Sequence, residues 1–128
     1  MRQTGFHPLD GATYLRQEGW PDGVCALVAH HSGSRFVARI HGLDGSLREF
    51  EFAEDEPSDV LTSADNTADL DGSLVKLSVR LREKLHRHGP DSPAARANPE
   101  RDDYIRAAAR RVIGRLTEIG RTDAYLDA

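Results

Sequence analysis

The stretch IRAAARRVIGRLTEIG, residues 105–120, decides the fold class because its apolar positions recur with the period of an α-helix. Those positions are Ile105, Ala108, Ala109, Val112, Ile113, Leu116 and Ile119. Residues spaced three and four apart share one face of a helix, and the glycine at position 120 is a typical end signal. The pattern predicts a C-terminal helix over about residues 101–119 with one buried face.

The rest of the chain is also predicted to be mostly helical. Pro8 suits the first turn of a helix, because its ring fixes φ and its missing N–H is not needed there. Glycines at positions 19 and 33 end the helical patterns that precede them. The helices expected from these signals cover residues 8–18, 21–31, 58–65 and 77–85. The sequence therefore predicts an all-α protein, a compact helical bundle.

Residues 36–52 allow two interpretations. Phe36, Val37 and Ile40 have helical spacing. The apolar runs 36–40 and 47–52 are joined through Asp44-Gly45, and Asp-Gly between two apolar runs is a signal for a short β-hairpin. Both interpretations stay open on the residues alone.

Composition limits the class of function. A chain of 128 residues is expected to form one domain, residues 1–128. The net charge of −4 and the 6% of aromatic residues argue against a nucleic-acid partner or an anionic membrane surface. No stretch approaches the roughly 20 apolar residues that span a bilayer, and no signal-like segment begins the chain. We therefore expect a cytoplasmic protein, in which the single cysteine, Cys25, is buried among apolar neighbours.

His7, His30, His31 and Asp65 are the candidate ligands of a metal ion. Imidazole and carboxylate together suit divalent manganese, iron, nickel or zinc. Adjacent residues of a helix point about 100° apart, so His30 and His31 do not easily address one point. Taken singly, a histidine at a helix start is often a cap, and an aspartate near a helix end often belongs to a polar cluster.

Three segments, in this order, resemble the HD superfamily of helical metal-dependent phosphohydrolases. They are TGFHPLDGATYLR at residues 4–16, CALVAHHS at 25–32 and LTSADNTADLDG at 61–72. The resemblance covers about residues 4–85, implies a bundle of the HD-domain type and favours helix at residues 36–52. It implies that His7 and one or both of His30 and His31 hold a second metal ion, while Asp65 completes the first metal site. The implied function is metal-dependent hydrolysis of a nucleotide or another small phosphorylated molecule.

The chain departs from the HD pattern near its start. The family's early histidine and its His-Asp pair are expected before His7, but six residues precede His7 and no His-Asp dipeptide occurs in the sequence. The aspartate of that pair bridges two metal ions in the family. The sequence therefore predicts an HD-like domain that is truncated at its N-terminus, with an incomplete metal site.

Two further expectations follow from this departure. The first is a non-catalytic HD domain that binds a partner, a ligand or itself, in place of a phosphohydrolase. Helices missing from the bundle would leave apolar faces exposed, so we expect a homodimer or a partner that covers them. The second is that the chain is the C-terminal part of a longer product, which restores the enzyme interpretation.

Overall fold

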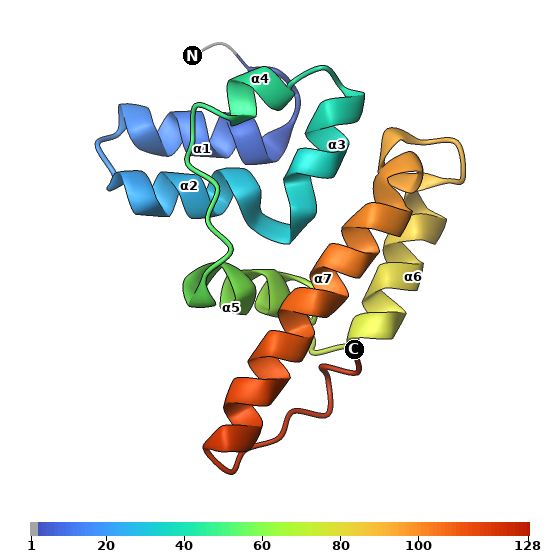
Figure 1. Ribbon diagram of the computed structural model, residues 1–128. Helices are drawn as coiled ribbons and strands as arrows, with labels where there is room; N and C mark the ends of the chain where they lie inside the picture. Colours follow the sequence, from blue (N-terminus) through green and yellow to red (C-terminus); the bar gives the residue numbers. More distant parts are fainter. Residues whose placement is uncertain (1–2) are drawn as a thin grey trace.

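The protein is all-α in the computed structural model, which describes residues 3–128 (Figure 1). Its helices are α1 (His7–Gln17), α2 (Asp22–His30), the 3-10 turn η1 (His31–Gly33), α3 (Ser34–Ile40), α4 (Asp44–Leu47), α5 (Glu56–Asp65), α6 (Leu77–His88) and α7 (Pro93–Glu118). Within residues 3–128 no strand is present, and an isolated antiparallel bridge joins Ala68 to Leu74. The predicted helical class is confirmed. The hairpin alternative at residues 36–52 is wrong, because α3 and α4 occupy that segment.

The N-terminal part of the core lies between α1, α2, α3 and α4. Helices α1 and α2 run side by side in opposite directions (Figure 1). Its buried residues are Leu9, Ala12, Cys25, Ala29, Ala38, Leu47 and Phe50. Ala12 and Ala29 have no exposed surface, and such small side chains let the two helix backbones approach closely. The predicted burial of Cys25 is confirmed, since 1% of the residue is exposed.

Helix α7 is longer than predicted and organises the second part of the core. It begins at Pro93, where the Ser92 hydroxyl caps it by accepting a hydrogen bond of 3.1 Å from the Ala95 N–H. This start was not predicted, because the helix runs through Pro99, and a proline usually ends a helical pattern. The buried residues of this second cluster are Leu77, Leu81, Tyr104, Ile105, Ala109 and Leu126.

Even α7 carries too many charges to cross a bilayer, and no helix in the described part of the chain meets the length and hydropathy required.

A sharp turn separates α2 from α3. Ser32 and Gly33 have φ angles of 55° and 67°, a left-handed backbone that breaks the helix as the Ser-Gly-Ser sequence predicts. A Cβ at position 33 would lie 2.9 Å from Cγ of Arg101, so α7 packs directly against this turn. The turn therefore places Ser32 against α5 and Gly33 against α7, while the His31 ring faces His7 at the start of α1.

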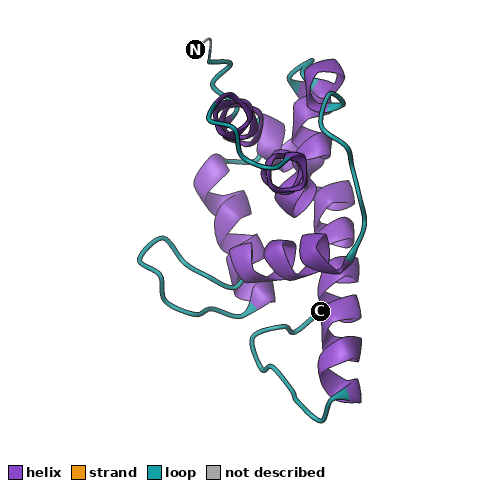
Figure 2. Cartoon of the chain, turned by 90° about the vertical axis from the view of Figure 1, so that its left-hand side faces the viewer, coloured by secondary structure: helices purple, strands orange, loops and turns teal. Residues whose placement is uncertain are grey.

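An ion-pair cluster joins α5 to α7. The Asp59 side chain has no exposed surface and accepts three hydrogen bonds of 2.9 Å, two from Arg111 and one from Arg115. Arg111 also lies 2.9 Å from Glu54, just before α5. In the side view, α5 lies across the stack of helices, between the α1–α2 pair and the lower half of α7 (Figure 2). The cluster fixes the helix that carries Asp65 at its end.

Candidate functional site

A cavity of about 460 Å³ lies where the start of α1, the turn η1, the end of α5 and helix α6 meet the start of α7. The titratable side chains that line it are His7, His31, His41, Asp65, Arg80, Lys84, Arg87, His88 and Arg101. We refer to it as the His7–Asp65 pocket. The structure brings three of the four predicted site residues, His7, His31 and Asp65, to this one cavity.

Two imidazoles face each other in the pocket. The ring centroids of His7 and His31 are 5.8 Å apart. The Nδ1–H of His31 donates a hydrogen bond of 2.6 Å to the Val28 carbonyl, which leaves Nε2 as the nitrogen available to a ligand. Burial, and then the neighbouring His31 ring, lower the pKa of His7 below its usual value. The His7 ring is therefore neutral at pH 7 and offers either a lone pair or an N–H.

Asp65 ends α5 and is held from two sides. The Ser32 hydroxyl donates a hydrogen bond of 2.5 Å to Oδ2, and the Nζ of Lys84 lies 3.9 Å from the same oxygen. Burial opposes ionisation of this carboxyl, but the Ser32 hydrogen bond and the Lys84 charge outweigh it, so the pKa of Asp65 lies below its usual value. Asp65 is therefore a carboxylate throughout the neutral range.

Lys84 carries a positive charge into the pocket wall. Its side chain is 15% exposed, and Nζ donates a hydrogen bond of 2.7 Å to Oδ1 of Asn66. Burial lowers the pKa of Lys84 to about 8, although Asp65 acts in the opposite direction. The ammonium is thus still predominantly charged at pH 7, in a position with few competing water contacts.

Three arginines extend this cationic wall. The buried Arg80 is neutralised by Glu83, 2.5 Å away, and by Asp69 at 3.6 Å. Arg87 lies 3.6 Å from Glu83, which is beyond ordinary hydrogen-bond distance. Arg101 donates from Nη2 to the Asn98 amide oxygen, a neutral partner. A chain with a net charge of −4 therefore concentrates four cationic side chains around one cavity that has a single lining carboxylate.

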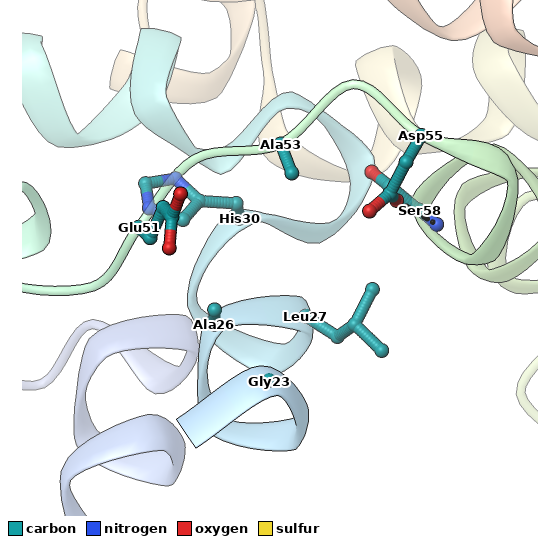
Figure 3. A pocket seen from close by; sticks show the side chains of 8 residues that line it. All are labelled: Gly23, Ala26, Leu27, His30, Glu51, Ala53, Asp55 and Ser58. Atoms are coloured by element: carbon teal, nitrogen blue, oxygen red, sulfur yellow. Dashed lines mark hydrogen bonds between the residues drawn. The ribbon is translucent and has the colours of Figure 1, made fainter.

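The structure does not bring His30 to this pocket. Its Nε2–H donates a hydrogen bond of 2.8 Å to the Phe50 carbonyl, and its ring packs edge-on against Phe52. His30 lines a separate cavity of about 260 Å³ together with Glu51 and Asp55 (Figure 3). This divergence from His31 is what the 100° step between adjacent helical residues predicts.

The donors of the His7–Asp65 pocket do not by themselves make a metal site. The separation of the His7 and His31 rings suits two imidazoles on one ion, with nitrogens about 2.1 Å from it. The third donor, Asp65, is engaged by Ser32 and Lys84. Among the residues that the structure describes, no group of three or more His, Cys, Asp or Glu side chains is placed to hold an ion. The described residues therefore do not fit a manganese, iron, nickel or zinc ion held by this chain alone.

Comparison of the chain with protein-family models, curated proteins and solved structures finds no match. The resemblance of three segments to the HD superfamily therefore remains a prediction from the sequence.

Sequence reasoning missed the cationic wall of the pocket. Arg80, Lys84 and Arg87 are spaced by four and three residues, which places them on one face of a helix, so the signal was present in the sequence. Arg101 had no such signal, because the helix that carries it was expected to begin there. Its approach to the pocket depends on the packing of α7 against Gly33.

Proposed function

We propose that this chain binds a small phosphorylated molecule, a nucleotide or another phosphate ester, in the His7–Asp65 pocket, as an HD-type phosphohydrolase would. The observation that carries the proposal is the gathering of four imidazoles, one carboxylate and four lysine or arginine side chains around one cavity. Ammonium and guanidinium groups are the side chains that recognise phosphate oxygens, and their hydrogen bonds to an anion are stronger than neutral ones.

Hydrolysis is the part of this proposal that depends on a divalent metal. HD-type chemistry uses a metal to supply the attacking hydroxide. The described donors do not complete such a site, so the geometry supports binding of the ester more strongly than its turnover. Manganese, iron, nickel and zinc are the ions to supply in an assay.

A non-catalytic binding module is the second candidate. It is favoured by the state of Asp65, whose carboxylate is already paired with Ser32 and Lys84. In such a module the same pocket would bind the phosphorylated ligand without releasing phosphate.

We also propose that the chain associates with itself or with a partner, in the reducing cytoplasm. Tyr14 and Trp20, at and just after the end of α1, are each at least half exposed, and Cys25 is a buried free thiol. Light scattering of the purified chain at several concentrations would measure its oligomeric state. A monomer at all concentrations would contradict self-association.

The experiment for the proposed function combines binding with turnover. AMP is titrated calorimetrically into the wild-type chain, and release of phosphate from AMP and from p-nitrophenyl phosphate is followed with added Mn²⁺ or Ni²⁺. We expect saturable AMP binding that His7→Ala weakens. His86→Ala is the matched control, because His86 is exposed on α6 and does not line the pocket.

The outcomes separate the candidates. Phosphate release that is lost in His7→Ala and in Asp65→Ala supports a hydrolase. Binding without release, with every metal tested, supports the non-catalytic module. If the chain neither binds AMP nor releases phosphate, the proposed function is contradicted.

A further inference from the structure

The Lys84 ammonium lies beside Asp65, the carboxylate that the HD resemblance assigns to a metal ion. Its Nζ lies 3.9 Å from Asp65 Oδ2, on the pocket side of α6, and is oriented by the Asn66 amide oxygen at 2.7 Å. The carboxylate thus already has a fixed positive neighbour supplied by the chain. A divalent ion bound to Asp65 would face this ammonium at close range and be repelled by it.

The Lys84 ammonium keeps donors available for a ligand. An ammonium has three N–H groups, and one of them is used by Asn66. Asp65 Oδ2 is too distant to accept a full hydrogen bond. At least one N–H of Lys84 is therefore free to donate to an anion in the cavity, from a side chain held in place by its burial.

Arg87 provides a second donor on the same face. Positions 84 and 87 are three residues apart, so their side chains lie one helical turn from each other. Arg87 lines the cavity, and its 3.6 Å separation from Glu83 leaves its guanidinium loosely paired. Arg80, by contrast, is committed to Glu83 and does not compete for the ligand.

We propose that Lys84 and Arg87 hold the phosphate group of a phosphate monoester directly, so that this chain binds its ligand without a metal ion. The inference rests on the proposed function and deepens it, because it names the residues and the class of phosphate. A monoester presents three terminal oxygens, which accept from Lys84, Arg87 and the N–H of the His7 ring on different sides of the pocket. A diester presents two and carries less charge.

The test measures AMP binding by calorimetry in EDTA. We expect the wild-type chain to bind AMP with the same dissociation constant in EDTA and in Mn²⁺, and to bind cyclic AMP, a diester, at least tenfold more weakly. Lys84→Met should raise the dissociation constant for AMP at least tenfold, because a charged hydrogen bond in a sheltered site is lost. Lys76→Met is the matched control, since Lys76 is the other lysine of the chain, is exposed and lies outside the pocket.

A second pair of variants tests whether weaker binding comes from a lost contact or from a loss of folding. Arg87→Gln is expected to weaken AMP binding severalfold, and because Arg87 is exposed the change should leave the circular dichroism spectrum and melting temperature unaltered. Arg82→Gln, at an exposed position of the same helix away from the cavity, should bind like the wild type.

Each result decides between the two proposals. Wild-type binding that Lys84→Met and Arg87→Gln leave intact overturns this inference and keeps the proposed function. Binding that EDTA abolishes also overturns the inference, and it supports a metal-dependent site. Equal affinity for AMP and cyclic AMP overturns the monoester class, and no wild-type binding at all overturns both proposals.

Discussion

Replacing Asp59 by asparagine tests whether the α5–α7 ion-pair cluster holds the end of α5 in position. The change keeps the size of the side chain and removes its charge, so Arg111 and Arg115 each lose a carboxylate at 2.9 Å. Removing one partner of a buried ion pair costs about 3–5 kcal/mol. The two arginines keep 36% of their side-chain surface exposed and can be hydrated again, so we expect a loss of about 3 kcal/mol.

Urea unfolding followed by circular dichroism measures this loss. The midpoint should fall while the slope with denaturant stays constant, and the melting temperature should drop by roughly 10 °C. Asp44→Asn is the control, because the Asp44–Arg48 pair on α4 is exposed and contributes little. If Asp59→Asn unfolds at the same urea concentration as Asp44→Asn, the cluster does not stabilise the fold as argued.

Four further predictions follow from single contacts. The pairing with Arg111 and Arg115, working against burial, holds the pKa of Asp59 below its usual value. The ion pairs of Asp59 therefore stabilise the fold fully above about pH 4, and this stabilisation is lost as the pH falls through the folded-state pKa of Asp59. The difference in unfolding free energy between the wild type and Asp59→Asn, measured by urea titration, should therefore be smaller at about pH 3 than at neutral pH. Gly33→Ala should destabilise the chain by about 1–3 kcal/mol in the same assay, because position 33 has positive φ and its Cβ would lie 2.9 Å from Arg101 Cγ; a neutral effect would contradict the tight turn. Lys84→Met should raise the unfolding free energy by about 1 kcal/mol, since the lowered pKa of Lys84 shows that the burial of its ammonium costs more than the Asp65 charge returns, and this exceeds the lost hydrogen bond to Asn66; a loss of stability would show that its polar contacts outweigh its burial. His30→Gln should lower the melting temperature and leave AMP binding unchanged, and weaker binding would show that His30 communicates with the pocket after all.

Local signals in the sequence predicted the helices that carry the site. The His-Pro start of α1, the Ser-Gly-Ser break after α2 and the apolar period of α7 each act within a few residues, so each was visible without the fold. The start of α7 was not, because Pro99 lies inside a helix that is stabilised by its cap at Ser92 and by packing along its length. Propensity is a weak guide where tertiary contacts decide.

The composition of the pocket depends on contacts that no local pattern encodes. The sequence named His7, His31 and Asp65, and the geometry of a helix already suggested that His30 and His31 diverge. Arg101 was missed because its approach to the pocket depends on the packing of α7 against η1, whereas the helical spacing of Lys84 and Arg87 was a signal that the sequence did contain. The Asp59 cluster was missed for the same reason, since 52 residues separate Asp59 from Arg111.

The cationic face of α6 is unfavourable for folding, which is itself an argument that it serves a ligand. Arg80 and Lys84 are like charges four residues apart on one helix face, an arrangement that destabilises a helix by a few tenths of a kcal/mol. Lys84 is also largely buried, and its lowered pKa records the cost of keeping an ammonium there. An apolar side chain at position 84 would pack against the same neighbours without that cost. A bound phosphate would reverse the balance, because it places negative charge between Lys84 and Arg87 where the chain supplies too little of its own. Stability and ligand affinity are therefore opposed at Lys84, a trade-off that is common at binding sites.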